Sequence, residues 1–169
     1  KPPPHTKTQK TTSPQTEDYK RHPTATTYNN IPLVHKRKGD YHKALEYYMK
    51  CMEIQQEHLD PDHPHTASIY NNIGSVHSSK GDYDKALEYM MKCLEIQQEK
   101  LGPDHPDTAT TYNNIGDVLQ SKGDYDKALE YHMKALEIRR EQLGPDNPHT
   151  ADSYNNIGTV HYSKGDYDK

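Results

Sequence analysis

The sequence predicts an all-α solenoid, a stack of antiparallel helix–turn–helix units, and three observations support this fold class. The string Tyr-Asn-Asn-Ile-Gly begins at Tyr70, Tyr112 and Tyr154, and a damaged copy begins at Tyr28, with a constant period of 42 residues. Within each period, apolar residues recur at helical spacing. The chain is also too poor in apolar residues for one globular core. A fixed period of this size is typical of solenoids.

The composition fits this architecture. Only 30% of the 169 residues are hydrophobic, and the chain contains neither Phe nor Trp. A solenoid needs less apolar surface than a globular domain, because each unit covers only its two neighbours. The net charge of −4 is modest and evenly mixed, which gives no electrostatic footprint for nucleic acid or an anionic membrane. We therefore expect neither as a partner.

The helix boundaries follow from turn signals, most clearly in the third repeat. There, His105-Pro106-Asp107 opens a helix, because Pro suits the first helical turn and Asp complements the helix dipole. Lys122-Gly123-Asp124 reads as a stop, a turn and a start, with Gly ending one helix and Asp capping the next. Gly144-Pro145 ends the second helix. The short connection predicts antiparallel neighbours.

The repeats divide the chain into five segments. These are a Pro/Thr-rich tail at 1–22, expected to be disordered, a degenerate repeat at 23–66, clean repeats at 67–108 and 109–150, and a truncated repeat at 151–169 that holds only a first helix and a turn. We expect that last first helix at about 148–164. In the degenerate repeat, Pro32 replaces the Gly of the other copies, which predicts a distorted or frayed helix over 24–38.

Cysteine and histidine positions also follow the repeat. Cys51 and Cys93 occupy one slot in successive repeats, and equivalent helices about 10 Å apart hold them too far from each other for a disulfide. We interpret both as small buried core residues, as in a reducing compartment. His35, His77 and His161 share another slot. Repeat-equivalent side chains point in parallel, so we expect core histidines and no metal site.

The motif residues resemble those of the tetratricopeptide repeat family (TPR). The resemblance is carried by Tyr112, Ile115, Gly116 and Leu119, followed by Ala128, with His132 at the usual Phe position. The double Asn and the linker Leu-Gly-Pro-Asp-His-Pro beginning at Leu101 resemble the kinesin light chain type of the repeat. The resemblance implies a right-handed superhelix whose first helices line a concave groove for extended peptides or a partner's helix. It also implies an adaptor role.

A polar stripe on each first helix would face this groove. In three repeats it consists of Ser68, Asn72, Ser75 and Ser79, of Thr110, Asn114, Asp117 and Ser121, and of Asp152, Asn156, Thr159 and Ser163. An Asn amide offers a donor and an acceptor, which matches one peptide unit of an extended chain. The alternative is that Asn merely solvates a helix face. The candidate groove residues are Asn30, Asn72, Asn114, Asn156, Asn71, Asn113, Asn155, Ser75, Asp117, Lys36 and Arg37.

The charges on the stripe suggest an orientation for a bound segment. Family members that clamp a terminal carboxylate use Lys or Arg on the groove face, whereas the position four before each second Asn holds Thr26, Ser68, Thr110 or Asp152. A carboxylate clamp is therefore not expected. Lys36 and Arg37 lie at one end of the stripe and Asp117 towards the other. A peptide with an acidic end near the first repeat would fit best.

We find no phosphate loop, no nucleophile motif and no cofactor motif. Acidic residues such as Glu130 recur at spacings that suit i,i+4 pairs, for example with Lys134. The sequence therefore predicts a non-enzymatic, cytoplasmic scaffold or adaptor for a protein or peptide partner, without a cofactor. The alternative is a structural spacer or a repeat array that associates with itself through an exposed terminal helix.

Overall fold

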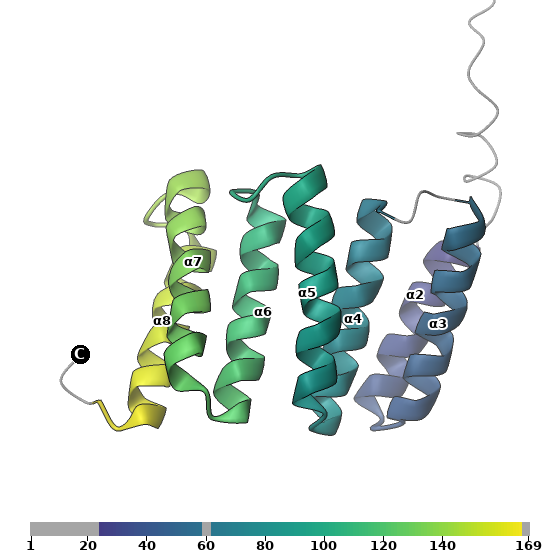
Figure 1. Cartoon of the computed structure of the whole chain (residues 1–169), viewed down its shortest axis with the longest axis horizontal. Helices are drawn as coiled ribbons and strands as arrows, with labels where there is room; N and C mark the ends of the chain where they lie inside the picture. Colours follow the sequence, from purple (N-terminus) through teal and green to yellow (C-terminus); the bar gives the residue numbers. More distant parts are fainter. Residues whose placement is uncertain (1–23, 59–61, 167–169) are drawn as a thin grey trace, which may run out of the picture.

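The computed structural model describes residues 24–58 and 62–166. In this part of the chain all regular structure is helical: α2 (Thr24–Arg37), α3 (Tyr41–His58), α4 (Pro64–Lys80), α5 (Tyr83–Lys100), α6 (Pro106–Lys122), α7 (Tyr125–Leu143) and α8 (Pro148–Lys164). Figure 1 shows the helices side by side along the long axis, from α2 and α3 at one end to α7 and α8 at the other. The expected solenoid is confirmed, and α8 has the bounds expected for the last first helix. The tail at 1–22 lies outside the described residues.

Glycines and caps set the helix ends where the turn signals indicate. Gly123 ends α6 with φ 88°, a left-handed conformation that Gly adopts without strain. The Asp124 carboxylate then accepts a hydrogen bond from the Lys127 backbone N–H at the start of α7. At the start of α6, Nδ1 of His105 accepts from the Asp107 N–H at 3.1 Å. The histidine before Pro is therefore itself the N-cap.

The buried core lies between adjacent helices along the whole stack. One cluster joins α3 and α4 and includes Ala44, Tyr48 and Ile73. Another extends from α5 to α8 and includes Met90 and Ile115. Both Cys51 and Cys93 are free and buried, as expected, and burial raises the pKa of each thiol. The core therefore follows the nearest-neighbour pattern of a solenoid.

The helix that contains Pro32 is continuous from Thr24 to Arg37, where a distorted or frayed helix over 24–38 was expected. Proline removes one helical N–H donor and crowds the preceding turn, which normally costs about 3 kcal/mol in a helix interior. Here the Pro32 ring is fully buried. Burial of its ring atoms offsets part of that cost, and the helix runs through the position.

His132 fills the contact that holds α6 and α7 together. Its side chain is 0% exposed, and a Cβ added to Gly116 would lie 2.7 Å from its ring. In the second repeat Met90 fills the same position, where a Cβ on Gly74 would lie 2.8 Å from Met90 Cγ. Neither ring nitrogen of His132 has a hydrogen-bond partner, and burial lowers its pKa to about 4. The neutral imidazole therefore acts as an apolar core residue.

Polar contacts between repeats reinforce the second and third junctions. Between the second and third repeats, Thr111 donates to Gln97 at 2.6 Å, and Lys122 pairs with Asp84 at 2.5 Å. Between the third and fourth, Arg139 donates to Ser153 at 2.8 Å, and Lys164 pairs with Asp126 at 2.7 Å. Equivalent positions, 42 residues apart, thus form a hydrogen bond and an ion pair at both junctions.

The first junction lacks these ties. Gln55 occupies the position of Gln97, but the position of Thr111 is taken by Ile69, which has no hydroxyl group. The buried Gln55 Oε1 has no hydrogen-bond partner. His42 replaces the Asp of the later repeats, and Lys80 pairs instead with Asp82 in its own repeat at 3.0 Å. The helices α3 and α4 also pack less extensively than α7 and α8. The first repeat is therefore joined less firmly to the stack.

Replacing Gln55 with Met should stabilise the protein by about 1 kcal/mol, because an unsatisfied buried acceptor costs about 1–3 kcal/mol. The matched change Gln97→Met should destabilise it, since Thr111 then loses its hydrogen bond to Gln97. Urea unfolding of both variants measures the two effects. Equal losses of stability in the two variants would show that Gln55 is satisfied like Gln97.

The protein should lose stability as the pH falls from about 6.5 to about 4. In this window an unfolded His132 binds a proton, while the folded one, with its pKa lowered to about 4, does not. Asp117, whose pKa is raised to about 6, opposes the effect because its folded form takes up a proton first. His132→Met, which copies Met90, should reduce the loss between pH 7 and pH 4.5 by about 2 kcal/mol. Urea unfolding at the two pH values tests this, and identical losses in both proteins would refute it.

Candidate functional site

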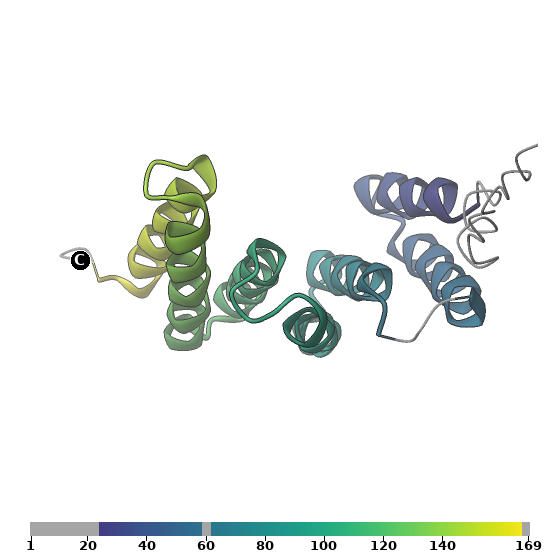
Figure 2. The ribbon, with the colours of Figure 1, turned by 90° about the horizontal axis from the view of Figure 1, so that it is seen from above.

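The predicted stripe runs along the first helices of the stack. Seen from above, α2, α4, α6 and α8 follow a shallow arc, and α3 and α5 lie on its outer side (Figure 2). Every stripe residue from Ser68 to Ser163 is exposed or half-buried, and the second Asn of each pair is half-buried in α4, α6 and α8. The side chain of Asn30 lies outside the described ones. The first helices therefore present one polar surface along the arc, here called the inner face.

Asparagine side chains tie the first helices to one another. Asn114 donates from Nδ2 to Oδ1 of Asn71 at 3.0 Å. One repeat further on, Asn156 donates in the same way to Asn113 at 2.7 Å. The second Asn of one repeat is thus linked to the first Asn of the preceding repeat. The amides hold neighbouring first helices in register.

These ties leave part of each amide available. Asn114 uses one N–H, so its second N–H and its Oδ1 have no partner within the described chain. Asn72 is half-buried and Asn155 is exposed. Asn113 accepts from the next repeat and donates to Asp117 at 3.2 Å. The inner face therefore combines structural amides with unused hydrogen-bonding groups.

The hydroxyl groups of the inner face donate inwards. Six of them bond a backbone carbonyl one helical turn earlier on their own helix: Ser68 to Pro64, Ser79 to Ser75, Thr110 to Pro106, Ser121 to Asp117, Thr159 to Asn155 and Ser163 to Thr159. The hydroxyl of Ser75 instead accepts a hydrogen bond from Lys36. A hydroxyl has one proton and two lone pairs, so these groups offer mainly acceptors to the outside. The inner face is consequently rich in acceptors.

The two basic candidates at the first repeat differ in their surroundings. Lys36 donates from Nζ to the Ser75 hydroxyl across the first junction, and partial burial lowers its pKa. Arg37 is exposed. Lys36 and Ser75 thus form a contact between α2 and α4, which leaves Arg37 as the more accessible cation of the two.

Asp117 is the acidic candidate in the middle of the inner face. Its side chain is 53% exposed, and one oxygen lies 3.7 Å from Nε2 of the buried His132. Desolvation raises its pKa to about 6, and the Arg139 charge acts in the opposite direction. The carboxylate is therefore ionised at neutral pH, and it becomes protonated under mildly acidic conditions.

The structure also bears on metal binding, membrane insertion and the core histidines. Among residues 24–58 and 62–166, no group of three or more His, Cys, Asp or Glu side chains is placed to hold a metal ion. No helix in this part of the chain is long and apolar enough to cross a membrane. The core interpretation of His77 is confirmed: it is buried, and its ring stacks on Tyr89 with centroids 5.6 Å apart.

Two features of the second helices were not apparent from the sequence. The expected pair between Glu130 and Lys134 is replaced by contacts of the Lys134 ammonium with the rings of Tyr112 and Tyr131, at 5.7 and 5.3 Å. A surface pocket beside Tyr70 was also missed. The recurrence of Tyr and Lys three residues apart in each second helix was the available signal.

Comparison with known proteins agrees with this architecture. The tetratricopeptide repeat family model matches residues 23–99, 66–140 and 107–169. No curated protein matches. The crystal structure of BtubC (BKLC) from P. vanneervenii superposes with a TM-score of 0.77 at 25% identity, covering 91% of this chain and 63% of that one. The chain therefore spans less than two thirds of that relative's length.

A second structural relative has the same fold. It is a kinesin light chain-like protein of Podosopora anserina with nearly identical TPR-like repeats, with a TM-score of 0.73 at 18% identity, covering 83% of this chain and 67% of that one. The fold is typically non-enzymatic and supports protein–protein interaction scaffolds. From the family match across 23–169 and the repeat structure, the chain belongs to the tetratricopeptide repeat family.

Proposed function

We propose that the protein is a scaffold or adaptor whose inner face binds an extended segment of a partner protein. The observation that carries this proposal is the row of half-buried asparagines on α4, α6 and α8. Asn114 is fixed by its bond to Asn71 and still has one N–H and one carbonyl oxygen unused. Such a fixed amide can pair with the backbone of an extended chain without a large entropic cost.

Charge on the inner face favours one orientation of the bound segment. Arg37 is exposed at the first repeat, while Asp117 and Asp152 are exposed further along the arc. Because the hydroxyl groups offer mainly acceptors, N–H donors and a basic residue of the partner suit the region of α6 and α8. An acidic residue suits the region near Arg37. The free buried cysteines fit a cytoplasmic, reducing location.

A second candidate function, self-association through α8, has its own supporting observation. Tyr154 is 52% exposed, whereas the equivalent Tyr112 is 8% exposed. A Cβ added to Gly158 would meet nothing within 4 Å, whereas the equivalent Gly116 lies against His132. A helix of a second copy packed on this face would bury it as α7 buries the same face of α6. The protein would then serve as a structural array.

The inner-face proposal is tested by capture of partners from a lysate with three versions of the protein. Asn72, Asn114 and Asn156 are changed to Ala in one version, and the control carries Met49, Met91 and Met133 changed to Ala, all exposed on second helices. Partners should bind the wild type and the Met variant and be lost from the Asn variant. Thermal melting checks that both variants fold, and a folded Asn variant that retains the partners would overturn the proposal.

Self-association is tested by sedimentation velocity over a wide concentration range. Wild-type protein that associates through α8 should show a mass that rises with concentration, and Tyr154→Ser should remove most of this rise by making the face polar. The matched control Tyr162→Ser changes an exposed tyrosine on the same helix. A strictly monomeric wild type would exclude the array.

A further inference from the structure

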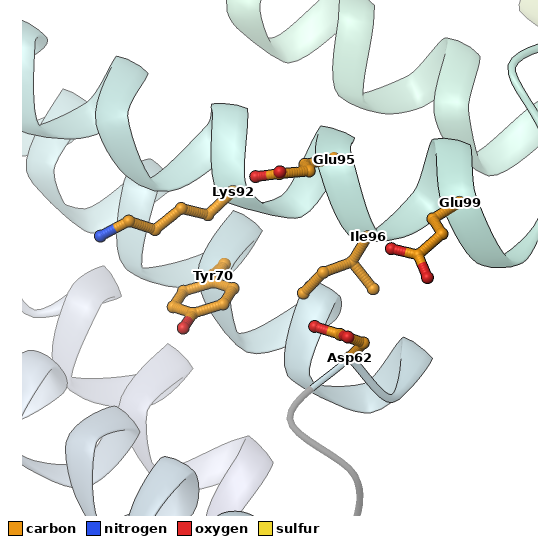
Figure 3. Close-up of a pocket in the computed structure, with 6 residues that line it drawn as sticks. All are labelled: Asp62, Tyr70, Lys92, Glu95, Ile96 and Glu99. Carbon is orange, nitrogen blue, oxygen red and sulfur yellow. The ribbon is translucent and has the colours of Figure 1, made fainter.

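A surface pocket of about 310 Å³ lies between α5 and the beginning of α4. Its lining residues are Asp62, Tyr70, Lys92, Glu95, Ile96 and Glu99. Figure 3 shows Lys92, Glu95, Ile96 and Glu99 projecting from α5, with the ring of Tyr70 across from them on α4. The pocket therefore combines an apolar wall with the three carboxylates of Asp62, Glu95 and Glu99 and one cation, Lys92, so that negative charge predominates.

The third repeat shows what the ring of Tyr70 is suited to contact. There, the equivalent tyrosine, Tyr112, is covered by the Lys134 ammonium at 5.7 Å from its ring centroid. In the second repeat the equivalent lysine, Lys92, bonds Glu88 at 2.8 Å and lies over Tyr89 at 5.1 Å. The cation position beside the tyrosine of the first helix is thus filled by the chain itself at Tyr112. At Tyr70 that side is a pocket, which the Lys92 side chain lines while its ammonium is held by Glu88 and Tyr89.

The carboxylates complete the chemistry for a cation. Glu95 is exposed and forms no ion pair with another described residue, while Glu99 pairs only with its neighbour Lys100 among the ion pairs of the described chain, at 3.2 Å. A Lys or Arg side chain places an alkyl stem against apolar surface and its charge towards carboxylates and an aromatic face. A bare metal ion would make no contact with the apolar surface of Tyr70 and Ile96, so a side chain with an alkyl stem fits the pocket better.

From this geometry we infer that the pocket binds a Lys or Arg side chain of a partner protein. The site is specific to the second repeat. Tyr112 is 8% exposed and its hydroxyl accepts from Gln98 at 2.7 Å, so the equivalent place at the next junction is closed by the preceding repeat. Tyr70 is only half-buried, because the first repeat packs less extensively on α4.

The pocket is distinct from the inner face. Tyr70 and Asn72 are two positions apart on α4, which places their side chains about 200° apart around the helix axis. A segment on the inner face therefore does not reach the pocket by the same backbone contacts. Loss of binding at one surface and retention at the other can be measured separately.

The test is an NMR titration of the whole 169-residue chain, labelled at tyrosine, with N-acetyl-arginine amide. The expected result is a saturable shift of the Tyr70 ring signals, with little change at Tyr112. N-acetyl-citrulline amide, which has nearly the same shape without the charge, should produce no saturable shift. Absence of a shift at Tyr70 with the arginine compound, or an equal shift with magnesium chloride, would overturn the inference.

Variants separate this site from a general effect of acidic surface. Glu95→Gln should weaken the affinity about two- to fivefold, as expected for a partly exposed ion pair. The matched change Glu137→Gln, in the same slot of the third repeat, should leave it unchanged. Tyr70→Leu should remove the remaining preference for the cation over citrulline, read from backbone amide shifts around Ile96. Equal effects of Glu95→Gln and Glu137→Gln would reduce the binding to non-specific charge attraction and reject the pocket.

Discussion

A second helix in this chain buries its outer apolar residues only when the first helix of the next repeat covers them, because a solenoid makes contacts with nearest neighbours alone. Each junction must therefore supply its own stability. The apolar part is similar where Ala and Val occupy equivalent buried positions in successive repeats. The polar contacts differ between junctions. Gln97 and Arg139 form hydrogen bonds with hydroxyl groups, whereas Ile69 takes the equivalent position at the first junction and Gln55 Oε1 has no hydrogen-bond partner.

The inner face depends on the same junctions. Asn71 and Asn114, and then Asn113 and Asn156, link successive first helices, so the amides that would contact a partner also fix the spacing between repeats. A bound chain would then meet groups that are already ordered, which lowers the entropic cost of binding. Among Asn72, Asn114 and Asn156, the structure shows no hydrogen bond from Asn72 to another described side chain. A substitution of Asn72 therefore tests contact with a partner more directly than a substitution of the other two.

The sequence was sufficient for the architecture, since period and turn chemistry are local properties. The 42-residue repeat, the Gly of Lys122-Gly123-Asp124 and the Pro of His105-Pro106 placed helix ends close to where they occur. Side-chain pairing across repeats could not be obtained in the same way. Lys92 and Lys134 occupy one slot and follow nearly identical residues, yet one bonds Glu88 and the other lies over Tyr112.

Pro32 and Lys36 show the same limit for single residues. Helix propensity alone predicts a distorted or frayed helix around Pro32, but the burial of its ring is a tertiary effect that propensity does not contain. From the sequence, Lys36 is expected to be a free cation at the end of a polar stripe. In the structure, its ammonium donates a hydrogen bond to the Ser75 hydroxyl of α4. In a chain of near-identical repeats, such differences arise from the neighbouring unit.

The looser first junction explains both the Gln55 oxygen without a partner and the partial exposure of Tyr70 beside the pocket, because α3 covers α4 less completely than α5 covers α6. Lys36 and Ser75 join the same two repeats from the inner face. One extended segment cannot occupy the inner face and the pocket along a straight path, since α4 stands between them. A partner that uses both must wrap around the first junction or contribute two separate segments. Either arrangement would stabilise the junction that lacks the hydrogen bond and the ion pair found at the two later junctions.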